Sequence, residues 1–252
     1  MNYFLAAQTE VGLKKSCNQD SVILKRAKFK GEEVCIGIIC DGMGGLSCGE
    51  LASKSIAEAF SDWFLYSYSK YESIWDESKM REDIGSIISS ENEGLLRYGK
   101  EYGIYLGTTI TAFLLVGKRF FVWHVGDSRL YKISSSKIER LTNDHTFIAK
   151  EVAEGRLTEK EAKNDPKRNV LLQCIGATER VNPDMFCGEV KKGDILLLCS
   201  DGFRHEISEK EMLSLLGRCE SNKLNEMIKR LISLNLRRNE QDNISAALVK
   251  VQ

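Results

Sequence analysis

The chain has 252 residues, and its 36 lysines and arginines balance its 36 aspartates and glutamates, so it carries no net charge. This balance lacks the positive excess that favours nucleic-acid binding, and no apolar run approaches the about 18 residues that span a bilayer. The N-terminus also lacks the basic start and long apolar run of a signal peptide. We therefore expect a cytoplasmic protein, and a monomer, that binds neither nucleic acid nor membranes.

Nothing in the composition divides the chain into parts. It contains only two prolines, and no glycine- or serine-rich run marks a linker. Its eight cysteines form no Cys-x-x-Cys pair and have no zinc-like histidine spacing. We expect reduced cysteines and one domain over residues 1–252.

Alternating or continuous apolar runs predict nine strands. Turns at Lys30-Gly31-Glu32 and Val116-Gly117-Lys118 join neighbouring strands into hairpins, so most strand pairs should be antiparallel. The predicted strands are 2–8, 20–28, 34–40, 107–116, 119–126, 129–134, 186–190, 194–200 and 244–251.

Apolar side chains at helical spacing predict helices at 49–65, at 82–98 and at about 222–236. A further helix should follow Ser208, which forms a capping-box pattern with Glu211. Helices must bury their apolar stripes on the outer faces of the sheets, while the inner faces of the sheets pack together. The pattern therefore predicts a single domain of sandwich type.

Aspartates recur where apolar runs end or begin. Asp41, Asp127 and Asp201 follow such runs, Asp242 precedes one, and Asp20 begins another. Several carboxylates held at strand ends would form an oxygen-rich site for Mg²⁺ or Mn²⁺. An isolated Asp-Gly pair is also a common turn, so the pattern alone leaves both interpretations open.

The order of the motifs makes the sequence more specific. It resembles the bacterial branch of the metal-dependent type 2C (PPM) serine/threonine protein phosphatases from about residue 3 to 250. The matching motifs, in order, are Gly12-x-x-Lys15-x-x-Asn18-Gln19-Asp20, Asp41-Gly42-Met43-Gly44-Gly45, Gly107-Thr108-Thr109, Val125-Gly126-Asp127-Ser128-Arg129-Leu130-Tyr131, Leu141-Thr142-Asn143-Asp144-His145-Thr146, Ser200-Asp201-Gly202 and Asp242-Asn243.

This resemblance implies an α+β fold, a four-layer αββα sandwich with two central, mainly antiparallel β-sheets flanked by helices. It also implies a site for two Mn²⁺ or Mg²⁺ ions. Asp41 would bridge both ions and Gly42 would contribute its carbonyl oxygen. Asp201 and Asp242 would bind the first ion, and Asp20 would lie near the second.

The resemblance further implies a third, weaker ion held by Asp127 together with Asp201. Asn243 would fix a neighbouring loop rather than bind metal. The implied reaction is hydrolysis of phosphoserine and phosphothreonine in proteins by a metal-bridged hydroxide, opposing a bacterial serine/threonine kinase. The alternative is a catalytically weak phosphatase-like regulatory module that binds phosphoproteins.

Three positions depart from the family pattern. Lys15, the expected phosphate-binding and catalytic cation, replaces an arginine, and lysine lacks the two-pronged guanidinium fork. Met43 and Leu46 lie where relatives carry histidine, and neither side chain can donate a proton. We therefore expect weaker phosphate binding and slower protonation of the leaving group.

The segment 146–169 resembles the flap over the active site of this family, and its mixed charge suggests contact with phosphoprotein substrate. We interpret His145, at the entry to the flap, as a structural residue. His124 lies in a predicted strand and should be a packed core histidine. The role of His205 is left open.

Overall fold

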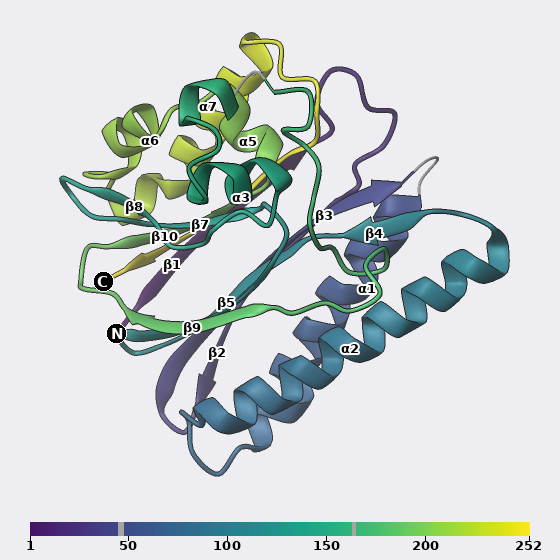
Figure 1. The fold of residues 1–252 in the computed structure, drawn as a ribbon. Coiled ribbons are helices and arrows are strands. Elements are labelled where there is room, and N and C mark those ends of the chain that lie inside the picture. The colour runs from purple at the N-terminus through teal and green to yellow at the C-terminus, as the bar shows by residue number, and fades with distance from the viewer. Residues whose placement is uncertain (45–47, 163–164) are drawn as a thin grey trace.

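Two antiparallel sheets pack face to face in the computed structural model, which describes residues 1–44, 48–162 and 165–252 (Figure 1). The first sheet has the strand order β1-β11-β10-β7-β8. Its strands are β1 (Tyr3–Glu10), β7 (Arg129–Ile133), β8 (Ile138–Arg140), β10 (Ile195–Cys199) and β11 (Ile244–Val251).

The second sheet has the order β2-β3-β5-β6-β9, and the short strand β4 pairs with the end of β3. Its strands are β2 (Asp20–Phe29), β3 (Glu32–Gly44), β4 (Leu106–Thr108), β5 (Ile110–Val116), β6 (Arg119–Val125) and β9 (Asp184–Glu189). Lys30 and Gly31 form the two-residue turn of the β2–β3 hairpin, both with positive φ, as this type of tight hairpin requires.

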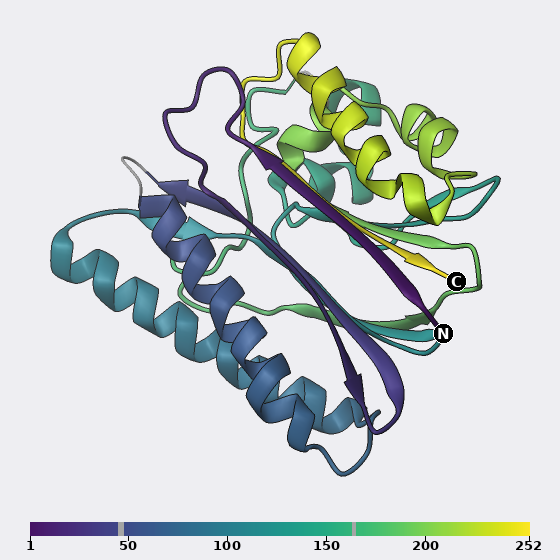
Figure 2. The same ribbon diagram turned by 180° about the vertical axis from the view of Figure 1, so that it is seen from behind.

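Helices cover both outer faces of the sheet pair. Figure 2 shows α1 (Cys48–Asp62) and α2 (Glu77–Tyr102) beside the second sheet and α7 (Leu224–Arg237) across the first. The same view shows the two termini side by side, where the Asn2 amide donates to the Gln252 carbonyl at 2.9 Å. The remaining helical segments are η1 (Trp63–Ser67), η2 (Tyr68–Lys70), α3 (Phe147–Ala153), α4 (Glu159–Ala162), α5 (Asp201–His205), α6 (Glu209–Leu216) and η3 (Ser221–Lys223).

Three apolar layers hold these four layers of secondary structure together. Adjacent residues on one strand serve different layers, because side chains alternate across a sheet. Ile38 of β3 packs toward α1 and α2, whereas Ile39 packs between the sheets. Leu197 of β10 packs toward the other helices, whereas Leu198 packs between the sheets. The fold is therefore the predicted αββα sandwich.

Most predicted elements are present, and the differences concern short ones. β8, α3, α4 and α5 were not expected, because segments of three to seven residues are too short to show a clear period. The helix predicted at 82–98 is longer: its N-cap Asp76 accepts from the Lys79 amide, and Gly103 ends it with φ 64.

No helix in the described part of the chain is long and apolar enough to cross a membrane. The strand ends that carry the aspartates meet at one end of the sandwich. The β1–β2 loop, drawn in purple at the upper right of Figure 1, lies at this end.

Candidate metal centre

Asp20 and Asp41 face each other across the β2–β3 hairpin as register partners. Side chains at such paired positions have Cβ atoms about 4.5–5.5 Å apart, and like charges placed there destabilise the sheet. Asp20 is buried, and neither of its carboxylate oxygens has a hydrogen-bond partner among the described residues. A cation is the natural partner for such a pair.

The other sheet contributes Asp201 and Asp242 to the same end of the sandwich. Asp201 follows β10 and Asp242 precedes β11, and these two strands are antiparallel neighbours. Ser200 and Ser245 fix their ends, since the Ser200 amide donates to the Ser245 carbonyl at 3.0 Å and the Ser245 amide donates to Ser200 Oγ at 3.1 Å.

Electrostatics shows that the carboxylates of the two sheets are close neighbours. Burial, followed by repulsion from Asp20 and Asp201, raises the pKa of Asp41 well above its ordinary value. Burial also raises the pKa of Asp20 to about 7, with repulsion from Asp201 and Asp242 adding to it. The hydroxyls of Ser200 and Ser245 lower this pKa, but neither meets hydrogen-bond geometry with Asp20. The group has an excess of negative charge.

The donor chemistry fits Mg²⁺ or Mn²⁺. Carboxylate and carbonyl oxygens are the ligands these hard ions prefer. Within residues 1–44, 48–162 and 165–252, no three or more His, Cys, Asp or Glu side chains form a ready-made group for one ion.

The backbone around Asp41 is fixed from both sides. The Asp41 amide donates to Thr109 Oγ1 at 3.0 Å, and its carbonyl accepts from the Thr109 amide and the Thr108 hydroxyl. Gly42 lies against Gly49, where an added Cβ would be 2.1 Å from the Gly49 carbonyl oxygen. Only glycine permits this close approach, which keeps the backbone beside Asp41 in place.

Lys15 lies beside the carboxylates on the β1–β2 loop. Its Nζ is 2.6 Å from Asp242 Oδ1, and its side chain is 39% exposed. Burial disfavours the ammonium, but contact with Asp242 and attraction to Asp41 and Asp201 raise the pKa of Lys15 above its ordinary value. Lys15 is therefore a cation at the edge of the negative group, as a phosphate-binding residue needs to be.

Asn243, which directly precedes β11, ties this loop to the first sheet. Its Nδ2 donates to the carbonyls of Val11 and Cys17, at 2.7 and 3.1 Å, and its Oδ1 accepts from the Gln19 amide at 2.9 Å. These bonds confirm that Asn243 fixes the loop, as expected. They also hold together the chain segments that carry Lys15 and Asp20.

Met43 follows Asp41 and Gly42 in the sequence, at a position where relatives carry a proton-donating histidine. Met43 Sδ is 3.5 Å from Cys174 Sγ, so its side chain packs against that sulfur atom. Because Met43 is a thioether, it has no proton to donate. Leu46, the other position where relatives carry histidine, lies outside the described residues.

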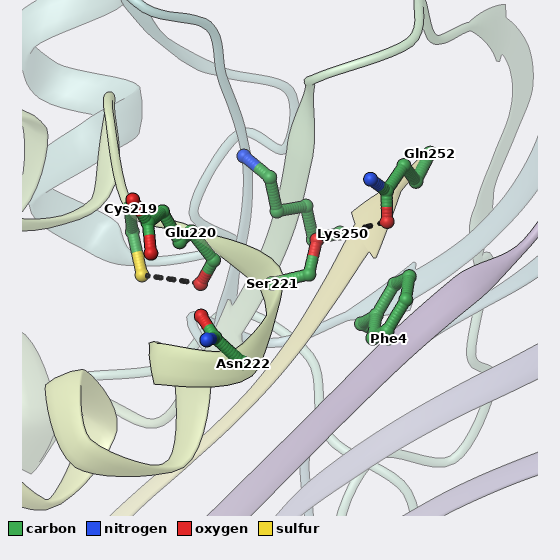
Figure 3. Close-up of a pocket in the computed structure, with 7 residues that line it drawn as sticks. All are labelled: Phe4, Cys219, Glu220, Ser221, Asn222, Lys250 and Gln252. Atoms are coloured by element: carbon green, nitrogen blue, oxygen red, sulfur yellow. Dashed lines mark hydrogen bonds between the residues drawn. The ribbon is translucent and has the colours of Figure 1, made fainter.

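A pocket of about 520 Å³ lies elsewhere, at the end of β1 and β11 remote from Asp242. Figure 3 shows Phe4, Lys250 and Gln252 at its strand side and Ser221 and Asn222 at its helix side. It contains none of the predicted site residues, so cavity size does not mark the functional centre here.

Comparison with known proteins identifies the group to which this geometry belongs. The family described as protein phosphatase 2C matches residues 11–251. The chain belongs to the protein phosphatase 2C family. A putative protein phosphatase 2C-type of Streptococcus pyogenes is 32% identical over 248 residues, covering 97% of this chain and 96% of that protein.

Solved structures agree with this membership. The serine/threonine phosphatase of S. agalactiae has a TM-score of 0.88 to this chain at 31% identity, covering 100% of both chains. The catalytic domain of the serine/threonine protein phosphatase PstP, solved in complex with two manganese ions, has a TM-score of 0.81 at 29% identity, again covering 100% of both. The fold and the enzyme class predicted from the sequence, a metal-dependent protein serine/threonine phosphatase, are confirmed.

Two histidines of this protein phosphatase 2C chain have the structural roles that were expected. His124 is fully buried, with its ring nitrogens 2.9 Å from Thr111 Oγ1 and 2.9 Å from the Asn143 carbonyl. His145 lies directly before the segment expected to form the flap, and its Nδ1 accepts from the Gly126 amide at 3.2 Å.

The third histidine joins two segments of the metal centre. His205 Nε2 is 3.4 Å from Asp201 Oδ2, and its Nδ1 is 3.4 Å from Glu240 Oε2. Burial opposes its protonation, but these two carboxylates raise the pKa of His205 to about 10. Glu240 Oε1 in turn accepts from the amides of Gln241 and Asp242. His205 thus links the chain at Asp201 to the chain at Asp242.

The sequence interpretation missed Arg204 and Glu240, and it left the role of His205 open. The spacing of Arg204 and His205 from Asp201 could have placed all three side chains together, because residues three and four positions apart share one face of a helix. That signal depends on knowing that a helix begins at Asp201, and α5 was not expected.

Proposed function

We propose that this chain hydrolyses phosphoserine and phosphothreonine in protein substrates, using Mn²⁺ or Mg²⁺ held by Asp20, Asp41, Asp201, Asp242 and the Gly42 carbonyl. The observation that carries the proposal is the buried Asp20 carboxylate. It faces Asp41 across the hairpin and has no hydrogen-bond partner in the described part of the chain. The two manganese ions in the structure of the PstP catalytic domain support the same cofactor here.

Different residues would bind the metal ions, position the site and bind the phosphoryl group. The carboxylates hold the cofactor, and Thr108, Thr109 and Asn243 keep the segments that carry Asp41, Lys15 and Asp20 in position. Lys15 would bind the phosphoryl oxygens and neutralise charge that develops on them. Bound divalent ions would lower the pKa of a water molecule for in-line attack on phosphorus.

We further propose that the whole chain works as one catalytic domain in the cytoplasm, where it opposes a serine/threonine kinase. Relatives named as serine/threonine phosphatases in Listeria and Mycobacterium tuberculosis support a phosphoprotein substrate. A regulatory module that only binds phosphoproteins would need none of the five ligand positions, and all five carry the expected residue types in this chain.

Release of phosphate from a phosphothreonine peptide tests this function. We expect turnover with Mn²⁺ and none after chelation. Mn²⁺ at 100 times its Kd should also stabilise the fold by about 2.7 kcal/mol, measured as a shift in thermal unfolding. Stabilisation by Mn²⁺ without turnover would instead favour the binding module. If Mn²⁺ causes neither stabilisation nor turnover, the proposed metal centre is wrong.

The proposed flap offers a second test, because backbone hydrogen bonds join the two ends of this segment. The Phe147 amide donates to the Val170 carbonyl and the Leu172 amide donates to the His145 carbonyl, at 2.8 and 2.7 Å. Deleting residues 150–168 and joining the ends with a short glycine linker should leave these hydrogen bonds in place. We expect kcat/KM for a phosphoprotein to fall at least about tenfold, roughly 1.4 kcal/mol, while hydrolysis of a small aryl phosphate changes little. Equal losses for both substrates would contradict a role for the flap in protein recognition.

A further inference from the structure

Asp127, the residue expected to hold a third ion, already has a cationic partner. Arg204 Nη2 is 3.2 Å from Asp127 Oδ2 and 3.1 Å from the Asp127 carbonyl oxygen. Both side chains are mostly shielded from water, with 15% and 13% of their surface exposed. One guanidinium nitrogen therefore engages the side chain and the backbone of Asp127 together.

The same short helix carries Arg204 and Asp201. α5 begins at Asp201, and Arg204 lies three positions later, on the same helical face. Arg204 interacts electrostatically with both Asp127 and Asp201. Its charge is thus near both carboxylates that a third ion would need.

Asp127 and its neighbour Asp144 are both paired with guanidinium groups. Arg129 Nε and Nη2 bind the two carboxylate oxygens of Asp144, at 2.8 and 2.6 Å. Arg204 Nη2 lies 3.8 Å from Asp144 Oδ2 in addition to its contact with Asp127. Two guanidinium groups thus face two carboxylates. The Asp20 carboxylate differs, since neither of its oxygens has a hydrogen-bond partner among the described residues.

A divalent ion bound at Asp127 would lie close to the positive charge of Arg204, and Arg204 cannot remove that charge by losing a proton. Guanidinium groups stay charged in proteins, and two like charges a few ångströms apart in a shielded site repel each other strongly. A divalent ion at Asp127 would therefore have to displace Arg204, whose other contact, Asp144, is already bound by Arg129.

We propose that the Arg204 guanidinium takes the place of a third metal ion, so that this chain binds two divalent ions and uses a fixed cation at Asp127. The proposal rests on the proposed function, because it assumes the two-ion centre at Asp41. It gives Asp127 and Arg204 a role that does not vary with the free metal concentration.

The number of bound Mn²⁺ ions tests this inference directly, by native mass spectrometry and by titration followed with electron paramagnetic resonance. We expect two ions per wild-type chain, also at millimolar Mn²⁺, and two in Asp127→Asn. Arg204→Ser frees the Asp127 carboxylate and should gain a third, weaker ion, which the double variant Arg204→Ser with Asp127→Asn should lose again. Arg230→Ser, at an exposed position of α7, removes the same charge elsewhere and should keep two.

Other results would overturn the inference. A third ion in the wild type that Asp127→Asn removes would show that Arg204 does not exclude it. A folded Arg204→Ser chain that still binds two ions would show that Arg204 is not what fills the site. If Arg204→Ser fails to fold, the comparison of wild type with Asp127→Asn still decides. Fewer than two ions in the wild type would instead contradict the proposed function.

Discussion

Asp41→Asn should abolish metal-dependent dephosphorylation and yet leave a well-folded protein. Asp41 is the carboxylate that we propose contacts both ions, and losing one preorganised electrostatic contact commonly costs about 10²–10³-fold in rate. The loss here should be at least that large, measured as kcat/KM on a phosphothreonine peptide with saturating Mn²⁺.

The same substitution should stabilise the metal-free protein. It removes one charge from the Asp20–Asp41 pair, and a like-charge cross-strand pair costs up to about 1 kcal/mol. For a chain of this size that corresponds to a rise in Tm of about 2–4 °C. The stabilisation caused by Mn²⁺ should shrink at the same time.

Asp62→Asn is the matched control for Asp41→Asn, because Asp62 is exposed at the end of α1 and its replacement changes the net charge equally. It should leave both turnover and the response to Mn²⁺ unchanged. Retained Mn²⁺-dependent turnover in Asp41→Asn would show that Asp41 does not hold the cofactor.

Lys15 should control the affinity for the phosphoryl group. A charge-assisted hydrogen bond contributes about 1.5–3 kcal/mol, so Lys15→Ala should lower kcat/KM for a small aryl phosphate by about 10- to 10²-fold. Lys15→Arg should raise it by about fivefold, since a guanidinium can add one further bond of about 1 kcal/mol to the phosphate.

The Lys15–Asp242 ion pair does not prevent this role. Its partners are 39% and 37% exposed, and ion pairs at such positions contribute only about 0–1 kcal/mol, so phosphate can compete for the ammonium. Lys14→Arg provides the control, because Lys14 is exposed in the β1–β2 loop and its backbone amide, not its side chain, donates to the Gln241 carbonyl at 3.3 Å. A Lys15→Arg enzyme slower than wild type would contradict phosphate binding by Lys15.

The strands and long helices could be predicted because their residues repeat with a clear period. Continuous apolar runs such as 110–116 and the stripes of α1 and α7 need no tertiary information. Short elements could not be predicted this way. α5 has only five residues and begins at Asp201 itself, so the pattern treated this aspartate only as the end of a strand.

Part of the metal centre also follows from local sequence. The tight turn at Lys30 and Gly31 fixes the pairing of β2 with β3, and this register places Asp20 opposite Asp41. The order of the motifs then identified the family, and with it the expected ligands Asp201 and Asp242. The placement of Asp20 opposite Asp41 depends on turn geometry and hairpin register, which neighbouring residues determine.

What local sequence cannot specify is which groups meet across the two sheets. Burial removes water from the carboxylates and brings those of both sheets together, which changes their pKa values. The direction of a side chain on a short helix likewise decides that Arg204 reaches Asp127 and that His205 reaches Asp201. The sequence by itself determined the strand-end aspartates and the enzyme class, whereas only the tertiary structure decided which cations accompany them, because contacts across the two sheets depend on packing rather than on any local pattern.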